Sequence, residues 1–297
     1  MNVSVNPKTG LKESFNEFYK LPLVHQRNVG TLRLDGQPKA VHTVPLRSGI
    51  TLDFISLLGR NDELIVALHG ANMAERNFYP RFERVNSLRT KTKALVAFAD
   101  PTLNSDPEKN MLLSWFLGGP GWDPAIAMLK VVEKAQRKVG AKHVAFVGGS
   151  GGGFAALRLS AMVPGSLAFV QDPQTVINSY LPKVVNRYFR TVWPGWNPEL
   201  LAEAFPERFD MVSHYQELRP QNFVFYTQSR SDSMHFNSHY TPFKLVSGVK
   251  EDQGMSRMGT RNFILYEGEV PGHGNITPPE FDSFYAKAMN FWRENRK

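Results

Sequence analysis

Residues 143–160 read HVAFVGGSGGGFAALRLS and contain the pattern G-x-S-x-G, centred on Ser150. An apolar run comes directly before the pattern, and an apolar helical segment follows it at once. A serine on so sharp a strand-to-helix turn needs small neighbours, because side chains at the flanking positions would collide with the strand or the helix. Such a turn exposes the hydroxyl and directs a helix N-terminus at developing negative charge. The stretch therefore predicts a nucleophile at Ser150.

Short, almost continuous apolar runs recur along the chain on both sides of this turn, and they suit strands buried on both faces of a parallel sheet. A helix expected over 124–139, capped by Asp123 and ended by Gly140, separates two of them. Ile126 and Val132 fall on its expected apolar face. Such crossovers indicate an α/β fold class with a mainly parallel central sheet flanked by helices. The runs of this kind are 64–68, 94–98, 144–147, 167–170, 223–226 and 263–266. Two earlier strands are expected at 42–46 and 51–57, and the apolar residues at the start of the second alternate, as in a strand with one exposed face.

The same pattern suggests how the chain is organised into domains. Residues 1–40 are polar and irregular, and we expect them to form an N-terminal arm. Residues 41–297 would form the α/β domain, with a final helix expected over 279–295. At about 180–220 aromatic residues and prolines interrupt the pattern, which indicates a small cap inserted over the carboxyl edge of the sheet.

The composition is ordinary for a soluble globular protein, with 42% hydrophobic and 21% charged residues. No apolar run approaches the roughly 18 residues that cross a bilayer. The N-terminus lacks a cationic start followed by an apolar core. We therefore expect no transmembrane segment and a cytoplasmic location. The absence of cysteine excludes disulfides, a thiol nucleophile and thiolate metal ligands.

The formal net charge is +8, which on its own is compatible with nucleic acid, anionic lipid or an acidic substrate. The positive residues are scattered, however, so we interpret them as a basic soluble surface and expect no nucleic-acid partner. A short cluster in the expected cap interleaves Lys183, Arg187 and Arg190 with aromatic residues.

A glycine-rich strand-to-helix turn also occurs in dinucleotide-binding domains. Gly151, Gly153 and Ala156 match the permissive form G-x-G-x-x-A. Asp172 follows near the end of the next expected strand, where an acid would bind a ribose. This second interpretation, a nicotinamide-cofactor enzyme, explains none of the motifs described next.

An expected apolar strand ends in His69-Gly70, followed by Ala71 and Asn72. Here the sequence resembles the α/β-hydrolase superfamily, whose loop after the third strand commonly begins His-Gly. In that superfamily a backbone N–H of this loop and the N–H of the residue after the nucleophile form the oxyanion hole. The resemblance implies Gly151 as one donor and Ala71, or alternatively Asn72, as the other, with Ala71 preferred. His69 is interpreted as structural.

The last expected strand is followed by His273, which lies between two glycines and before the final helix. The superfamily keeps its general base at this place, and flanking glycines let the ring approach a serine hydroxyl. The acid usually follows the seventh strand, which implies Asp232, with Asp172 after the sixth strand as the alternative. The acid fixes the tautomer of the histidine and stabilises the imidazolium. The order Ser150, Asp232, His273 matches that of the superfamily.

Other candidate residues carry weaker signals. His235 and His239 have the spacing of two ligands on one helix face, but the segment lacks a third ligand, so no metal or other cofactor is expected. Trp115 and Trp122 lie in loops expected at the active-site edge, and Trp193 lies in the expected cap. All three are candidate substrate-binding residues, with ordinary packing as the alternative.

The leading hypothesis is a serine hydrolase that cleaves a carboxylic ester through an acyl-enzyme on Ser150. Its substrate would be a small-molecule, glycan or lipid ester. The first alternative keeps this chemistry but passes the acyl group to a sugar or lipid hydroxyl, which makes an acyltransferase. The second is a non-catalytic ligand-binding protein on a hydrolase scaffold, because a fold alone does not grant activity. The motifs specify neither the acyl group, nor the alcohol, nor the oligomeric state.

Overall fold

The computed structural model describes residues 3–47, 49–72, 79–274 and 276–296. The chain divides into two compact units, Met1–Val144 and Ala145–Lys297. The boundary falls near the start of strand β8 (His143–Gly149), so β8 is described with the second unit. The predicted division into an arm over 1–40 and one domain over 41–297 stays a prediction.

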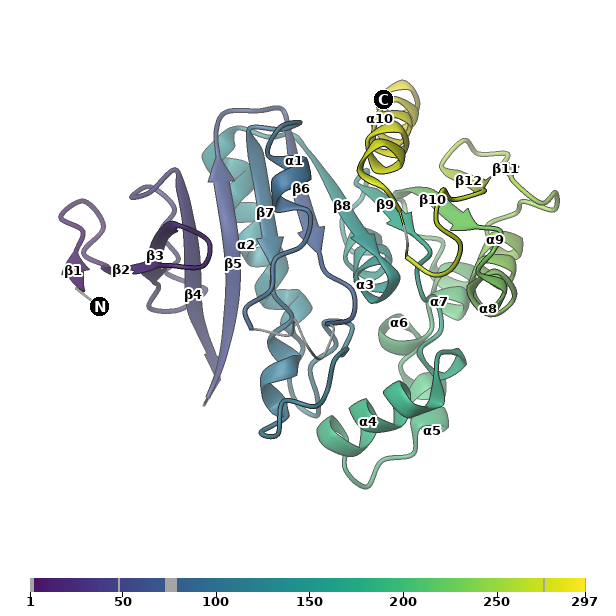
Figure 1. The fold of residues 1–297 in the computed structure, drawn as a ribbon, viewed down its shortest axis with the longest axis horizontal. Coiled ribbons are helices and arrows are strands. Elements are labelled where there is room, and N and C mark those ends of the chain that lie inside the picture. The colour runs from purple at the N-terminus through teal and green to yellow at the C-terminus, as the bar shows by residue number, and fades with distance from the viewer. Residues whose placement is uncertain (1–2, 48, 73–78, 275, 297) are drawn as a thin grey trace. The chain divides into compact units, whose positions relative to one another are not determined.

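The first unit contains strands in the order β1-β2-β3-β4-β5-β7-β6 (Figure 1). Strands β4, β5 and β7 are antiparallel neighbours, whereas β6 and β7 run parallel. Strands β6 and β7 are buried along their whole length, which explains their continuous apolar sequences. The bounds are β1 (Ser4–Val5), β2 (Lys12–Asn16), β3 (Leu21–His25), β4 (Lys39–Arg47), β5 (Ile50–Leu58), β6 (Glu63–Leu68) and β7 (Ala94–Phe98).

Residues 1–40 were expected to be irregular, and for three segments this expectation was wrong. Strands β1, β2 and β3 form an antiparallel set, and β3 pairs in parallel with β4. A small apolar cluster of Leu11, Val24 and Ala40 holds this edge. Because most other side chains here are polar or partly exposed, the segment lacks the hydrophobic period by which a strand is recognised.

The first unit also contains helix α2 (Pro124–Val139), whose bounds and caps agree with the prediction. The Asp123 side chain accepts the N–H of Ala125 at 2.9 Å, and Gly140 adopts a left-handed φ of 77°. The predicted apolar face was partly wrong, because Ile126 is 57% exposed. Small alanines on the buried face allow close approach of the helix backbone. That face consists of Ala125, Met128, Val131, Val132, Ala135 and Val139. A short helix, α1 (Val85–Leu88), completes this unit's α-helices among the described residues.

The second unit contains strands in the order β8-β9-β10-β12-β11. Strands β8, β9, β10 and β12 are parallel neighbours, and β11 pairs antiparallel with β12. The parallel pairing agrees with the prediction, and the carboxyl ends of these strands therefore share one edge. The bounds of the remaining strands are β9 (Leu167–Gln171), β10 (Phe223–Ser229), β11 (Gly254–Met255) and β12 (Arg261–Tyr266).

Helices α3 and α10 both pack against β9. Phe169 of β9 contacts Phe281 and Tyr285 of α10. In Figure 1, α10 lies above the strands of this unit, and α4 and α5 lie below them. The segment 180–220, expected as a cap, supplies helices α4 to α7 between β9 and β10. The bounds are α3 (Ser150–Ala161), α4 (Pro182–Val192), α5 (Pro198–Ala204), α6 (Pro206–Phe209), α7 (Met211–Leu218), α8 (Ser233–His235), α9 (Thr241–Val246) and α10 (Pro278–Asn295).

Helix α10 closes the described chain and agrees with the predicted final helix. Thr277 and Glu280 form a reciprocal capping box at its start. Its buried face is largely aromatic, which anchors it on the sheet. Within the part of the chain that the structure describes, no helix, α10 included, combines the length and the apolar character that crossing a membrane requires.

Candidate active site

Ser150 lies at the turn between β8 and α3, as predicted. Its φ of 52° is in the left-handed region, which is unfavourable for a residue other than glycine. A Cβ at Gly148 would lie 2.2 Å from the carbonyl oxygen of Gly152. A Cβ at Gly153 would lie 2.5 Å from the Cβ of Pro173. The turn that presents Ser150 therefore requires glycine at both of these positions.

Three of the predicted residues form one continuous hydrogen-bonded chain. The Oγ of Ser150 lies 2.8 Å from Nε2 of His273, and Nδ1 of the same ring lies 2.7 Å from Oδ2 of Asp232. The nitrogen that faces the carboxylate is assigned the proton, because a carboxylate can only accept. Nε2 then accepts the hydroxyl of Ser150. A neutral imidazole in this tautomer is ready to take the hydroxyl proton.

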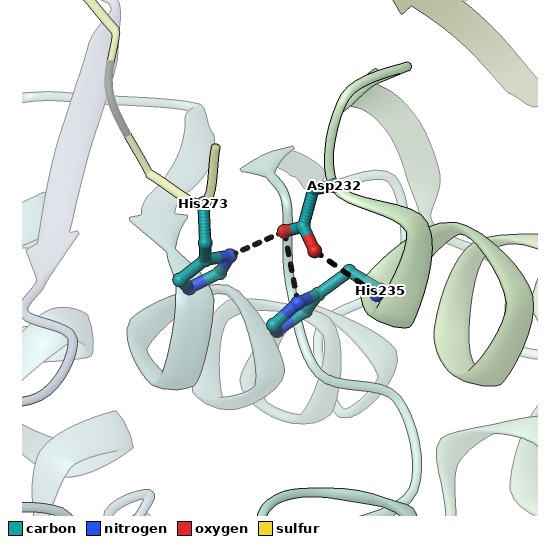
Figure 2. A group of neighbouring side chains, drawn as sticks. All are labelled: Asp232, His235 and His273. Carbon is teal, nitrogen blue, oxygen red and sulfur yellow. Dashed lines mark hydrogen bonds and ion pairs between the residues drawn. The ribbon is translucent and has the colours of Figure 1, made fainter. Parts of the chain in front are cut away.

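Asp232 is buried and accepts from two directions. Its Oδ1 accepts the backbone N–H of His235 at 3.2 Å, and its Oδ2 lies 2.9 Å from Nδ1 of the same residue (Figure 2). Burial acts to raise the pKa of Asp232, but the contacts with His235 and His273 outweigh it. The pKa of this carboxyl group therefore lies well below its usual range, and Asp232 is ionised at neutral pH.

His273 lies on the loop between β12 and α10. Its neighbours Gly272 and Gly274 have φ values of 105° and 68°, which suit glycine. The N–H of Gly272 donates to Oγ of Ser231 at 2.9 Å. This bond ties the loop of His273 to the turn after β10, which carries Asp232.

The alternative acid, Asp172, has different partners. Its Oδ1 accepts the backbone N–H of Ser229, and its Oδ2 accepts the hydroxyl of Tyr266, both at 2.7 Å. Burial raises the pKa of Asp172, and these hydrogen bonds offset the effect only in part. The geometry therefore favours Asp232 over Asp172 as the partner of His273.

A scan of protein-family models and a search of curated protein sequences find no match for this chain. Solved structures do resemble it. The capsule O-acetyltransferase of Neisseria meningitidis serogroup A is 13% identical with a TM-score of 0.56, over 88% of this chain and 96% of that chain. An S-formylglutathione hydrolase from Agrobacterium tumefaciens is 13% identical with a TM-score of 0.57, over 87% and 95%. Carboxyl esterase 2 from Tuber melanosporum is 12% identical with a TM-score of 0.53, over 88% of each chain. The chain has the α/β-hydrolase fold.

Two backbone amides were predicted to form the oxyanion hole that the α/β-hydrolase resemblance implies. Gly151 lies in the first turn of α3, where the N–H groups have no acceptor within the helix and the helix dipole favours negative charge. In the first unit, the N–H of Asn72 donates to the carbonyl of Leu112 at 2.8 Å and is therefore occupied. Ala71 stays the preferred second donor, and its role stays a prediction.

His69, the histidine of the His-Gly motif, has structural contacts. Its Nδ1 donates to the carbonyl of Gly70 at 2.7 Å, and its Nε2 accepts the N–H of Asp100 at 2.9 Å. Burial lowers the pKa of His69, so the ring is neutral. The bond from Asp100 ties the loop after β7 to the loop after β6, and both bonds agree with the structural interpretation of His69.

The three candidate tryptophans have different environments. Trp115 is completely buried. Trp193 is also buried, and its indole N–H donates to the hydroxyl of Tyr188 at 2.9 Å. Trp122 is partly exposed, with the Arg47 guanidinium 5.6 Å from its ring centre. The packing alternative fits Trp115 and Trp193, and substrate binding by any of the three stays a prediction.

Two residues that the sequence analysis did not assign to the site contact it directly. Gln174 donates from Nε2 to Oγ of Ser150 at 3.0 Å, and the same nitrogen lies 2.8 Å from Nε2 of His235. The ring of His235 stacks on that of His273, with centroids 3.8 Å apart and an interplanar angle of 12°. A signal was present, because Gln174 follows the carboxyl end of β9 and His235 follows that of β10.

His235 and His239, which have the spacing of two ligands on one helix face, have different partners in the structure. His239 accepts the N–H of Thr175 at its Nδ1, while His235 joins Asp232 and His273 in a group whose ligand-type atoms lie within 4.8 Å of one another. Figure 2 shows the rings of His235 and His273 beside the carboxylate of Asp232. Because the rings are nearly parallel, their in-plane lone pairs do not converge on one point. A metal ion would require the rings to rotate out of the stack, so the group fits a proton network better.

Proposed function

We propose that this chain is a serine hydrolase that cleaves a carboxylic ester through an acyl-enzyme on Ser150. The observation that carries the proposal is the hydrogen-bonded chain from Ser150 through His273 to Asp232. A hydroxyl is a weak nucleophile at neutral pH, and an imidazole within hydrogen-bond reach is the base that activates it. An ionised carboxylate on the far side of the ring stabilises the imidazolium that forms. The esterases among the structural neighbours support the same class of chemistry.

In the first step, Oγ of Ser150 bonds to the carbonyl carbon of the ester while its proton passes to Nε2 of His273. The carbonyl oxygen becomes an oxyanion, for which the N–H of Gly151 is a donor. A donor of this kind is worth about 3 kcal/mol of barrier. The bond between the carbonyl carbon and the alcohol oxygen then breaks, and the alcohol leaves with the proton from His273.

In the second step, a water molecule attacks the acyl carbon and gives its proton to His273. The bond to Oγ breaks, the acid leaves, and Ser150 regains its proton from His273. Asp232 stays ionised throughout, because its contacts with two histidines hold its pKa well below the usual range. Its role is therefore to orient and stabilise His273 and not to accept a proton.

A second candidate function is transfer of the acyl group to a sugar or lipid hydroxyl. The capsule O-acetyltransferase among the structural neighbours favours it, since the similarity covers 96% of that chain. Both functions form the same acyl-enzyme on Ser150. They differ only in whether water or an alcohol then takes the acyl group.

Labelling with a fluorophosphonate tests the proposal, because this reagent reacts with activated serines. We expect the purified chain to be labelled, with labelling lost in Ser150→Ala and strongly slowed in His273→Ala. Ser283→Ala, at an exposed position of α10, is the matched control and should label like the unaltered chain. A folded chain that is not labelled would contradict the proposal and favour the ligand-binding scaffold.

Product analysis separates hydrolysis from transfer. The chain is given p-nitrophenyl acetate with and without a sugar acceptor such as N-acetylglucosamine, and nitrophenol and acetate are measured. A hydrolase releases the two in equal amounts whether or not the acceptor is present. A transferase releases less acetate than nitrophenol, and the difference equals the amount of acetylated sugar.

A further inference from the structure

His235 connects the two ends of the hydrogen-bonded series Ser150–His273–Asp232, directly at Asp232 and through Gln174 at Ser150. Its ring stacks on His273, its Nδ1 lies 2.9 Å from Oδ2 of Asp232, and its Nε2 lies 2.8 Å from Nε2 of Gln174. Gln174 in turn donates to Oγ of Ser150 at 3.0 Å. The five side chains therefore form a closed ring of contacts, with His235 only 1% exposed.

The directions of the hydrogen bonds determine the protonation of His235. Because the hydroxyl of Ser150 gives its proton to His273, its Oγ accepts from Gln174, which sets the orientation of the Gln174 amide. The amide nitrogen can only donate, so Nε2 of His235 accepts and carries no proton. His235 is thus neutral, with its proton on Nδ1 beside Asp232. Burial, the largest influence, lowers the pKa of His235 in agreement with this assignment.

The hydrogen bond to Asp232 alone does not fix the plane of the His273 ring. Changes in the side-chain torsions, with a small shift of the loop, can still tilt a ring held at Nδ1 and swing Nε2 away from Ser150. The loop that carries His273 has no regular secondary structure, and the side chain of His273 is 31% exposed. His235 is buried at the end of α8, where the π-helical turn η4 (Phe236–Tyr240) begins. A buried flat ring at 3.8 Å restricts this rotation.

We infer that His235 is a positioning residue, whose neutral ring face holds the plane of His273 and stabilises the imidazolium formed when His273 takes the serine proton. The inference rests on the proposed function, since it assumes that Ser150 and His273 react as described. The faces of Trp, Tyr and Phe rings attract a cation within about 6 Å, and we extend this to the neutral imidazole ring of His235. A protonated His235 would instead repel the charge on His273, so the neutral form is the one that assists.

The titratable groups around His235 keep it neutral on balance. The negative charges of Asp232 and Asp172 favour the protonated form, whereas burial and a proton on His273 oppose it, and burial is the largest influence. The rings of Tyr180 and His239 also face His235, with centroids 5.7 and 5.1 Å away. Burial lowers the pKa of His239 to about 3, so this neighbour is neutral as well.

Two substitutions separate the ring face from the polar contacts. His235→Phe keeps a flat ring but removes both nitrogens, and His235→Leu removes the nitrogens and the flat face together. We measure kcat and KM for p-nitrophenyl acetate and the rate of fluorophosphonate labelling. A small misplacement of a reacting group costs up to about 100-fold, so we expect kcat to fall about 50-fold in His235→Leu at unchanged KM, and less than about fivefold in His235→Phe. His214→Leu, at a buried histidine of α7, is the matched control and should leave both rates unchanged.

Equal losses in His235→Phe and His235→Leu would overturn the inference, because the polar contacts and not the ring face would then matter. An unchanged kcat in His235→Leu would overturn it too. If His235→Leu does not fold, His235→Phe decides alone, since a folded His235→Phe chain that labels slowly contradicts the inference. Failure of the proposed function is distinguishable, because the unaltered chain would then not be labelled at Ser150.

Discussion

The loops after β9 and β10 each carry a buried aspartate, and the two carboxyl groups behave in opposite ways. Asp172, after β9, accepts from a hydroxyl and a backbone amide, which are neutral donors. Asp232, after β10, contacts two imidazole rings. Burial acts to raise the pKa of both, and it prevails at Asp172 but not at Asp232. The donors around a buried carboxyl group therefore decide whether its pKa rises or falls.

The different partners of the two aspartates also indicate different roles, a structural one for Asp172 and a chemical one for Asp232. Asp172 ties together the ends of two strands, because Ser229 ends β10 and Tyr266 ends β12. Its own φ of 42° is in the left-handed region, so the surrounding bonds hold it in an unfavourable conformation. Asp232 instead faces the ring that contacts Ser150. We interpret Asp172 as a structural brace and Asp232 as the acid of the proposed reaction.

The largest expected effect comes from exchanging Asp232 for asparagine, with the same exchange at Asp172 as the comparison. Asp232→Asn should lower kcat for p-nitrophenyl acetate by about 10⁴-fold, because an amide favours the wrong tautomer of the histidine. Asp172→Asn should lower kcat by less than about tenfold and act mainly on stability, since its partners are structural. A larger loss of kcat in Asp172→Asn than in Asp232→Asn would reverse the assignment.

A second substitution tests the brace directly. Tyr266→Phe leaves Oδ2 of Asp172 without its hydroxyl donor in a buried place. We expect the free energy of unfolding in urea to fall by about 1–3 kcal/mol, the usual cost of such a group. The kcat of the folded variant should stay close to that of the unaltered chain. A loss of kcat as severe as that of Asp232→Asn would show that Asp172 takes part in the chemistry.

The pH dependence of stability should have opposite signs at the two sites. The pKa of Asp172 is raised above its unfolded value of about 3.9, so its contribution to stability declines as pH rises from about 4 towards the folded pKa. The pKa of Asp232 is lowered, so its contribution is present above about pH 4 and is lost as pH falls towards the folded pKa. Urea unfolding of both asparagine variants between about pH 3 and pH 7 measures this. Asp172→Asn should remove the fall in the free energy of unfolding that occurs as pH rises above about 4, and Asp232→Asn the fall that occurs as pH decreases below about 4.

If the free energy of unfolding of the two variants changed with pH by the same slope, the proposed difference between the two aspartates would be wrong.

The smallest expected effect concerns the bond between the loop of His273 and the turn after β10. Ser231→Ala removes the acceptor of the Gly272 N–H, a bond worth about 1 kcal/mol, which corresponds to roughly a fivefold change in an equilibrium. We expect kcat to fall by about threefold, as His273 leaves its position for part of the time. Ser283→Ala again serves as the control. A rise in kcat would mean that the bond holds the loop away from its active position.

The glycine pattern around Ser150 predicted the strand-to-helix turn, because the space available at each position of the turn depends mostly on residues close by in the sequence. Gly148 and Gly153 are required by contacts with the turn and with the next strand's loop, and the glycine pattern reports this directly. His273 and Asp232 are 41 positions apart in the chain, and their pairing was predicted from the superfamily resemblance and chain order, not from local chemistry.

Contacts between polar side chains on separate loops were not predictable in this way. Gln174 and His235 each follow the carboxyl end of a strand, which places both at one edge of the sheet, but they are 61 positions apart and no sequence pattern predicts that they touch. The prediction also placed Ile126 on the buried face of α2, where it does not lie, because large apolar residues were taken to mark that face and small alanines in fact form part of it. The strands within 1–40 were missed because edge strands with polar side chains resemble coil.

The glycines of the turn also limit how this protein can change by mutation. Neither Gly148 nor Gly153 has room for a single methyl group, so a library randomised at these positions would consist almost entirely of variants that cannot form the turn. Variation in a search for new substrates is therefore better placed on the loops after β9 and β10, whose residues contact Ser150 and His273. The proposed nucleophile, Ser150, then keeps its position while its surroundings vary, which makes those loops the place to begin directed evolution.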